Sequence, residues 1–502
     1  MYLRAGVFSL GLLLLSRILG LLRETAQAAA FGSTGLGDAV IVMFTLPDLL
    51  VGILVSGALS YVLLPVWPKQ SAGAQAAGQR KIAFVLILAG FSFGLLLWLF
   101  RDSMVRALAP GLTGDIKIIS ASALGWSAMV LPLAMLAALW ATRLQYERDF
   151  VGMYAANLIV NLALVIGLVV VAQSVFFEPV PAADSLSHPL RLLGGCLVLA
   201  MLGRLAWLAW RLPVGTQPTE IDKATALPGP GVWLWAALSS GLLLVFPLAA
   251  RSFASSAGEG SLASFNYAWK LVELPLVLAV QLVAGLAFPA IARTEAGTPA
   301  RQQAVGLAFL VAWALACAAI VVVSIFALPV ADLLFGWGRM SSAHLSTIAE
   351  WSEIGIWSLL PQALMAVLLT VMATEARMHT AVWVLGAGLA VLLSAGWWLG
   401  VNGSRVMWLL NGVFICMAIV LMLLERRSIK NGFPYLACLA PLLVCAGLVS
   451  LKPLLLGIST PLMLIFCALF ALLVISSGGI VSPVLRNLLR EKLTAIASTT
   501  FK

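Results

Sequence analysis

Residues 12–25 read LLLLSRILGLLRET, a stretch that is apolar enough for the interior of a membrane except for its two arginines. The apolar run around it continues for about 25 residues, which is longer than the hydrophobic region of a signal peptide. The stretch is therefore predicted to lie in a retained first transmembrane helix. Because a guanidinium group inside a membrane helix is costly, the presence of Arg17 and Arg23 there requires a reason.

The composition extends this prediction to the whole chain. Of its 502 residues, 62% are hydrophobic and only 10% are charged, whereas a soluble domain carries about 25% charged residues. The net charge of +10 would suggest a nucleic-acid partner in a soluble protein. In a membrane protein it reflects basic cytoplasmic loops, so no nucleic acid is expected. The six cysteines form no metal-binding or disulfide pattern, and neither a metal nor a cofactor is predicted.

A transmembrane helix needs about 20 mostly apolar residues. The fourteen segments that meet this criterion are 6–31, 38–66, 81–100, 119–142, 152–172, 191–211, 230–254, 263–288, 302–329, 347–373, 379–400, 405–424, 433–454 and 459–478. An even number of spans places both termini on the same side of the membrane. If that side is the cytoplasm, the inner loops hold more than twice as many Lys and Arg residues as the outer loops, in accord with the positive-inside rule. The sequence thus predicts an all-α polytopic membrane protein with both termini in the cytoplasm.

A polar stretch separates the sixth and seventh predicted spans. It reads PVGTQPTEIDKATALPGPG at 213–231, and backbone of this composition does not lie exposed in hydrocarbon. It is therefore predicted to be a cytoplasmic linker between two lobes. The predicted domains are an N-terminal lobe of six helices (1–212), the linker (213–229), a C-terminal lobe of six helices (230–428), and two further helices with an amphipathic cytoplasmic tail (429–502).

The second and eighth spans share a pattern. LPDLLVGILVSGAL and LPLVLAVQLVAGLA each place a glycine ten residues after a proline. Spans that are six apart have the same orientation, as in transporters that rock two halves around a central site. A proline inside a helix frees a carbonyl group and bends the helix. The predicted hinge positions are Pro47, Gly57, Pro275 and Gly285.

Charged residues inside the predicted spans mark the candidate site. The cations are Arg17, Arg23 and Lys270, and the acids are Glu24, Asp38, Asp48 and Glu273. Each costs roughly 2.5–3.5 kcal/mol on insertion scales, and such residues usually face a cavity or a partner. The cations are predicted to bind an anion, and arginine suits phosphate because its fork donates two parallel hydrogen bonds. The acids are predicted to hold the cations in place or to exchange partners with them.

Other roles remain open for these charges. They could be structural ion pairs, or long side chains that extend to the membrane surface. Arg204, near the end of a predicted span, is interpreted in this way, and Arg251 fits either role. An enzyme that polymerises or ligates glycans is a further alternative. It would need acid–base groups on a long outer loop, which the three histidines and the short outer loops do not provide, so a non-enzymatic function is predicted.

Several stretches together resemble one known family. They are SRILGLLRETAQAAAFG at 16–32, GDAVIVMFTLPDLL at 37–50, SGALSYVLLPV at 56–66, APGL at 109–112, LQYERDF at 144–150, NYAWKLVELPL at 266–276 and LLFGWGRMS at 333–341. In order and spacing they resemble the MurJ/MviN family of lipid II flippases, within the multidrug/oligosaccharidyl-lipid/polysaccharide exporter superfamily.

The resemblance implies a fold of fourteen helices, with two six-helix lobes around a cationic cavity and two last helices beside a groove for a polyprenyl tail. It implies a flippase of the bacterial inner membrane that moves an undecaprenyl-pyrophosphate-linked glycan outward by alternating access. Arg17, Arg23 and Asp38 fall on motif positions of the family, and Lys270 stands where arginine is usual. The implied partners are the lipid-linked glycan, the bilayer, and a glycan polymerase or synthase.

The chain also departs from the family pattern. Asp48, Val51, Gly52 and Ser56 stand where the family typically has Asn, arginine and Glu, and Ala249–Arg251 lacks an acid often seen in the seventh helix. The departures leave a lipid-linked exopolysaccharide or O-antigen unit open as the substrate. A scaffold without transport activity and a drug exporter of the same superfamily are the remaining alternatives.

Overall fold

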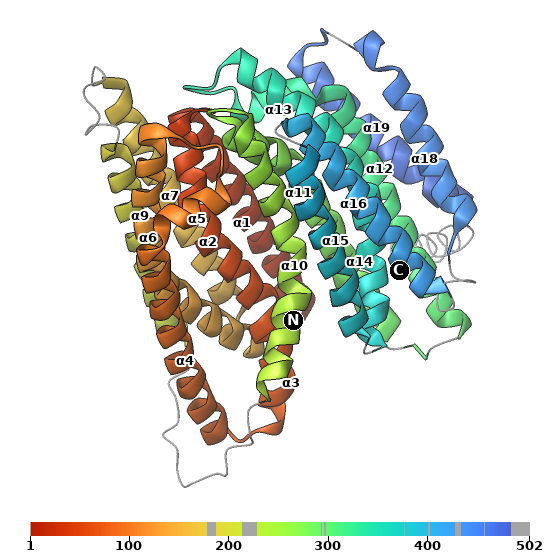
Figure 1. Cartoon of the computed structure of the whole chain (residues 1–502). Helices are drawn as coiled ribbons and strands as arrows, with labels where there is room; N and C mark the ends of the chain where they lie inside the picture. Colours follow the sequence, from red (N-terminus) through yellow and green to blue (C-terminus); the bar gives the residue numbers. More distant parts are fainter. Residues whose placement is uncertain are drawn as a thin grey trace. The chain divides into compact units, whose positions relative to one another are not determined.

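The computed structural model describes residues 2–177, 187–212, 228–292, 294–295, 298–375, 377–399, 402–426, 433–455 and 457–482. All regular elements in these ranges are helices, and no β-strand occurs among them (Figure 1). Each of the fourteen predicted spans coincides with a helix or with consecutive helical segments. Within the described ranges, eleven helical stretches are long and apolar enough to cross a membrane. The all-α membrane class is therefore confirmed, whereas the count of fourteen spans stays a prediction.

Packing divides the chain into two compact units. The first consists of Met1–Asn266, Leu334–His344 and Gly400–Gly403, and the second of Tyr267–Leu333, Leu345–Leu399 and Ser404–Lys502. The predicted lobes at 1–212 and 230–428 rest on a linker and a sequence repeat and not on packing, and they stay a prediction. Residues 213–227 of the predicted linker and 483–502 of the predicted amphipathic tail lie outside the described residues.

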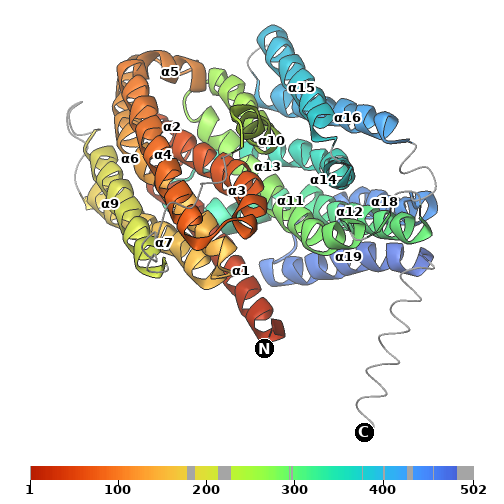
Figure 2. The ribbon, with the colours of Figure 1, turned by 90° about the horizontal axis from the view of Figure 1, so that it is seen from below.

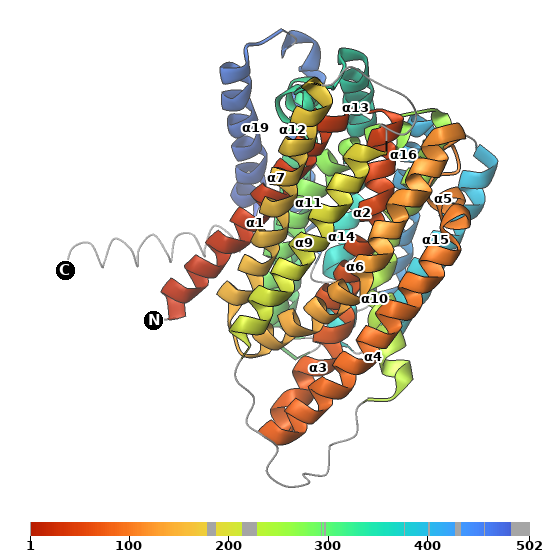
Figure 3. The same cartoon turned by 90° about the vertical axis from the view of Figure 1, so that its left-hand side faces the viewer.

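The first unit is a bundle organised around one long helix. Its helices are α1 (Tyr2–Phe31), α2 (Gly35–Ile53), α3 (Leu59–Val66), α4 (Ala72–Leu99), α5 (Arg101–Leu108), α6 (Gly114–Tyr146), α7 (Phe150–Phe177), α9 (His188–Arg211), α10 (Pro230–Ala254) and the start of α11 (Ser261–Ala292). Helix α6 packs against α2, α4, α7 and α9, and α1 packs along α7. Figure 3 shows α4, α6, α9, α7 and α1 lying side by side.

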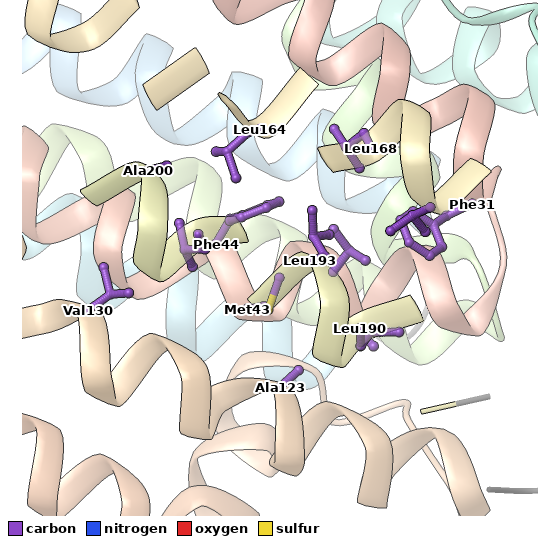
Figure 4. Close-up of a cluster of buried hydrophobic side chains, with 14 of the residues drawn as sticks. Phe31, Met43, Phe44, Ala123, Val130, Leu164, Leu168, Leu190, Leu193 and Ala200 are labelled. Atoms are coloured by element: carbon purple, nitrogen blue, oxygen red, sulfur yellow. The ribbon is translucent and has the colours of Figure 1, made fainter. Parts of the chain in front are cut away.

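Apolar residues of α1, α2, α6, α7 and α9 form the core of this unit. Phe31, Met43, Phe44, Leu164 and Leu193 are buried together there (Figure 4). Between α4 and α6 the packing depends on glycine, because small residues let membrane helices approach closely. A Cβ atom on Gly94 would lie 2.6 Å from the carbonyl oxygen of Ala128. The hydrophobic core thus fixes the positions of α1 and α2, which carry most of the candidate site.

The second predicted span is interrupted. Pro47 lies inside α2, and a π-helical turn, η1 (Leu54–Ala58), separates α2 from α3. Gly57 in this turn lies against Ser240 of α10, and a Cβ atom there would collide with the serine side chain. Turns of this kind are rare and occur frequently at functional sites. The hinge role of Pro47 and Gly57 stays a prediction, as does that of Pro275 and Gly285, which both lie in α11.

Among the described residues, the second unit contains the remainder of α11 and seven further α-helices. Its elements are α12 (Pro299–Phe335), α13 (Ser342–Gly355), α14 (Leu359–Thr374), α15 (Met378–Leu399), α16 (Gly403–Leu424), α18 (Tyr435–Ser450) and α19 (Thr460–Val481). Helices α18 and α19 pack on each other (Figure 2), and α18 packs on α12 through Leu310 and Cys438. In α12 the backbone leaves helical geometry at Phe326, three residues before Pro329.

Candidate functional site

The start of α2 carries a buried carboxylate. Thr34 caps this helix by accepting a hydrogen bond from the amide of Gly37 at 3.4 Å, and Asp38 follows in the first turn with 0% of its surface exposed. Its two carboxylate oxygens accept hydrogen bonds from the amides of Gly260 at 2.8 Å and Ala263 at 2.7 Å. Asp38 therefore caps the N-terminal turn of α11, where free amides and the helix dipole favour negative charge.

In this conformation the partners of Asp38 are thus backbone amides and not the cations that the sequence suggested. Asp38 makes no ion pair in the part of the chain that the structure describes. The carboxylate joins the beginning of α2 to the beginning of α11. Its role as a partner of the cationic site stays a prediction for another conformation.

Arg23 of α1 is shared between two acids. Its Nη2 atom donates to Glu24 at 2.9 Å and to Asp48 of α2 at 3.3 Å. The guanidinium group also lies over the ring of Phe44, 5.5 Å from its centroid, which is a favourable cation–π distance. Glu24 is buried, whereas the side chain of Asp48 is 54% exposed. Of the two acids, only Asp48 is open to an incoming ligand.

A chain of hydrogen bonds continues from Glu24 into two more helices. Its second oxygen accepts from Nδ2 of Asn266 at 3.2 Å. Oδ1 of Asn266 accepts from Nη1 of Arg251 at 2.7 Å, and Nη2 of Arg251 donates to the hydroxyl of Thr45. This chain connects α1, α11, α10 and α2 within the first unit. Together with Asp38, it holds these helices together at one end of the bundle.

Arg17 lies six residues before Arg23 on α1 and has different surroundings. It is exposed, and no ion pair of the described residues includes it. It interacts electrostatically with Tyr154 of α7, the helix against which α1 packs. A guanidinium group without a carboxylate partner on a membrane helix is suited to bind an anion.

Lys270 belongs to the second unit, whereas Arg17 and Arg23 belong to the first. Its Nζ atom pairs with Glu273 at 2.8 Å, one turn further along α11, so the local pair expected from the spacing of these residues is present. Whether Lys270 shares a ligand with the two arginines stays a prediction. Among the described residues, no cluster of three or more His, Cys, Asp or Glu side chains could hold a metal ion.

Three residues of this site were not identified from the sequence. Arg251 fitted either a structural or a functional role, and Asn266 and Thr45 were not singled out at all. The available signal was that each is polar and lies within or beside an apolar span, which suggests a buried partner. The neutral side chains give no indication of that partner, because an amide or a hydroxyl bonds acids, cations and backbone groups alike.

The fold and the site define an all-α membrane protein with charged residues inside its helix bundle. The structure is similar to that titled "Lipid II flippase MurJ, inward closed conformation", with a TM-score of 0.77 and 14% identity over 94% of this chain and 98% of that chain. It is also similar to the "Inward-facing conformation of a multidrug resistance MATE family transporter of the MOP superfamily", with a TM-score of 0.63 and 15% identity over 82% of this chain and 94% of that chain. At these identities the likeness shows the fold alone.

The sequence then defines the family. The family model described as "Lipid II flippase MurJ" matches residues 27–475, so the chain belongs to the lipid II flippase MurJ family. The resemblance found in the sequence is thereby confirmed. This is a family of transporters, in agreement with the prediction that the chain is not an enzyme, and it places the chain in a bacterial inner membrane.

Individual relatives match less completely. The "Probable lipid II flippase MurJ" of Rickettsia prowazekii is 32% identical over 111 residues, which is 22% of each chain. The "Lipid II flippase MurJ" of Burkholderia cenocepacia is 24% identical over 357 residues, 68% of this chain and 67% of the relative. The "Probable lipid II flippase MurJ" of Rhizobium meliloti is 25% identical over 400 residues, 76% of this chain and 71% of the relative. The aligned part of this chain thus spans about one fifth of the Rickettsia relative and about two thirds of the other two.

Proposed function

We propose that this chain moves a lipid II-like precursor, a glycan linked to undecaprenyl pyrophosphate, from the inner to the outer leaflet by alternating access. Membership of the MurJ family supports this function. The observation that carries it is Arg17, an exposed guanidinium group on a membrane helix with no ion pair among the described residues. Such a group needs an anion, and a substrate that crosses the membrane with a pyrophosphate group supplies one.

Arg17 and Arg23 are the proposed pyrophosphate ligands of the first unit, and Lys270 is the proposed ligand of the second. Arg17 and Arg23 are six residues apart, so they point about 120° apart on α1 and would reach different oxygens of a diphosphate. Arg23 keeps Glu24 as a close partner at 2.9 Å. Its longer contact to the exposed Asp48, at 3.3 Å, is the one that a phosphate oxygen would replace.

The hydrogen bonds that join α1, α2, α10 and α11 support the proposal that these helix ends form a gate, which is closed in this conformation. If both termini are cytoplasmic, as proposed from the basic loops, Asp38 and Asn266 lie toward the outer end of the bundle. Release of the glycan outward then requires the bonds from Asp38 to Gly260 and Ala263 to break. Transport becomes a population shift between two states, which substrate binding biases by favouring one of them.

A second substrate is favoured by one specific observation. Asp48 places an exposed carboxylate beside Arg23, and Val51 and Gly52 bring no positive charge to the same helix. This less cationic helix would suit a lipid-linked exopolysaccharide or O-antigen unit as the cargo. A glycan polymerase or synthase that uses the flipped product is the proposed protein partner in either case.

Complementation tests the proposal. The chain would be expressed in a bacterium depleted of its own lipid II flippase, with membrane insertion measured by a C-terminal fluorescent tag. We expect rescue by the wild type, which would show that a lipid II-like precursor is accepted. Failure of a normally inserted wild type would exclude lipid II, and surface polymer in a deletion strain would then test the second substrate.

In the same strain, Arg17→Ala is expected to abolish rescue at unchanged membrane level, because it removes the unpaired cation. Arg106→Ala is the matched control, since Arg106 is exposed on the short helix α5 and bonds only the nearby Ser103 among the described residues. Full growth with Arg17→Ala would contradict the assignment of the pyrophosphate site.

A further inference from the structure

Gln27 of α1 is a buried polar residue that the proposed mechanism does not use. Only 2% of its surface is exposed, and its Nε2 atom has no hydrogen-bond acceptor among the described residues. It follows Arg23 by four residues, so the two side chains lie on the same face of α1, one turn apart. The Nε atom of Arg23 is also buried and without an acceptor in the described part of the chain. Two donor groups that lack an acceptor therefore lie on consecutive turns of one helix.

A purely structural role does not explain the amide of Gln27. The residues that follow it on the same helix, Ala30 and Phe31, belong to the hydrophobic core of the first unit. An apolar side chain of similar size at position 27 would suit these surroundings and would avoid burying an amide that makes no hydrogen bond. Buried polar groups are satisfied in most native structures, so each exception requires an explanation. An acceptor that binds between the two donors would account for both of them.

The face of α1 that carries these donors indicates the chemistry of the acceptor. Counting about 100° per residue from Arg23, Gln27 points about 40° away and Arg17 about 120° away in the same sense. Glu24 lies within this sector, but its carboxylate already accepts from Arg23 at 2.9 Å and from Asn266 at 3.2 Å. The face thus presents two cations and one neutral donor. This combination suits an anion with several acceptor oxygens, such as a diphosphate.

The position of Gln27 along the helix places it on one side of Arg23. Four residues correspond to about 6 Å along the axis of α1. If the termini are cytoplasmic, as proposed from the basic loops, this step leads outward, so Gln27 lies between Arg23 and the outer end of α1 at Phe31. A substrate that leaves Arg23 toward the outer leaflet would therefore meet Gln27 next.

From this arrangement we infer that Gln27 is a further substrate ligand, whose Nε2 atom donates a hydrogen bond to the second phosphate of a pyrophosphate group while Arg23 binds the first. The inference rests on the proposed function, since it takes a pyrophosphate to bind at Arg23. Because Gln27 is buried in this conformation, the contact forms when the outer end of the bundle opens. A monophosphate on Arg23 would not reach Gln27. The glutamine therefore contributes to the preference for a pyrophosphate over a monophosphate.

Ligand binding and thermal unfolding of Gln27→Met test this role. The purified full chain in detergent is titrated with farnesyl pyrophosphate, with farnesyl monophosphate, and with farnesol as the ligand that lacks phosphate. We expect Gln27→Met to weaken the farnesyl pyrophosphate affinity about tenfold, as for the loss of one hydrogen bond to a charged group. The monophosphate affinity should change by no more than about twofold. The unfolding temperature should stay the same or rise, because methionine fills a similar volume without an unsatisfied amide.

Thr25→Val is the matched control, because Thr25 is a polar residue of the same helix that points about 200° away from Arg23, and it should leave both affinities unchanged. An unchanged pyrophosphate affinity in Gln27→Met would overturn the inference, as would an equal loss for both phosphates, which a disturbance of Arg23 would cause. If Gln27→Met does not fold, Gln27→Leu replaces it. A wild type that binds farnesyl pyrophosphate no better than farnesol would instead contradict the pyrophosphate site itself.

Discussion

At the scale of single residues, the candidate site is governed by which acid each cation finds. Arg23 binds both Glu24 and Asp48, while Arg17 is exposed and has no ion pair in the described part of the chain. Asp38 of α2 binds backbone amides of the α11 N-terminus. Residues with the same formal charge thus have distinct tasks, because burial and neighbouring groups decide what each can bind.

Asp38→Asn is predicted to destabilise the protein in detergent by about 1–3 kcal/mol, the usual cost of leaving buried hydrogen-bonding groups unsatisfied. The amides of Gly260 and Ala263 donate to different carboxylate oxygens, so in an asparagine side chain one of these two amides would face an NH2 group, which cannot accept. Thermal unfolding measures the change. Asp102→Asn, at an exposed acid in the first turn of α5, is the control, and equal unfolding temperatures for the two variants would contradict the predicted capping role.

The sequence predicted that α1 and α2 carry the charged site, because charges inside apolar spans are visible without a structure. It did not predict the partners. Asp38 was expected to face cations, and the role of Arg251 was left open, because which residues meet depends on how four helices pack. Hydrogen bonds such as that between Arg251 and Asn266, at 2.7 Å, join residues of different helices, and no local pattern encodes them.

At the scale of elements, close contact between helices depends on single glycines. Gly94→Ala is predicted to lower the stability by about 1–3 kcal/mol, the usual penalty for overpacking, because its Cβ atom would lie 2.6 Å from the carbonyl oxygen of Ala128 on α6. Gly78→Ala is the matched control on the same helix, since nothing lies within 4 Å of its Cβ position. It should be neutral or stabilising by up to about 1 kcal/mol. Equal unfolding temperatures for the two variants would contradict close packing of α4 on α6.

In each half of the chain, a side-chain hydrogen bond joins the start of one helix to the end of another. In the first half, Gln75 near the start of α4 accepts from Arg143 near the end of α6 at 2.9 Å. In the second half, Arg301 near the start of α12 donates to Glu375, just after α14, at 3.0 Å. Gln75 and Arg301 each also donate to backbone carbonyls of the segment before their own helix. The two contacts have similar positions but opposite donor and acceptor roles, and the internal repeat predicted from proline and glycine spacing stays a prediction.

A further pair of this kind gives a pH dependence. Asp149, between α6 and α7, pairs with Arg211 at the end of α9 at 2.7 Å. Partial burial raises the pKa of Asp149, but hydrogen bonds from Arg211 and the Gly152 amide lower it more, so that it lies below its ordinary value. A lowered pKa in the folded state contributes stability that is present above the unfolded-state pKa and is lost as the pH falls through the folded-state pKa.

The difference in unfolding temperature between wild type and Asp149→Asn is therefore predicted to be constant above about pH 5 and to shrink below about pH 4. Thermal unfolding in detergent from pH 7 to pH 3 measures it. A difference that grows on acidification would contradict the assignment, because the pair would then be weaker when ionised than when protonated.

At the scale of the whole molecule, the sequence was most informative about class. Apolar segments of about 20 residues predict spans reliably because the bilayer imposes a fixed length, and each predicted span coincides with helical structure. The short helix α5 was missed, because its RDSMVRAL sequence is too brief and too polar for that criterion. The break at η1 was missed as well, since a π-turn has no characteristic composition. The division into compact units after Asn266 depends on contacts between distant segments, which composition does not reveal.

The π-turn at Leu54–Ala58 determines how α3, the C-terminal segment of the second span, can move relative to α2. A π-turn contains one residue more than an α-turn, and each residue of an α-helix turns the chain by about 100° and advances it by about 1.5 Å. Absorbing the surplus residue into regular helix would therefore rotate Leu59–Val66 about its own axis with little lengthening. The part of α2 that carries Asp38 would keep its orientation meanwhile. Different side chains of one span could then face the lumen of the transporter in its two states without any bending of the segment that anchors it.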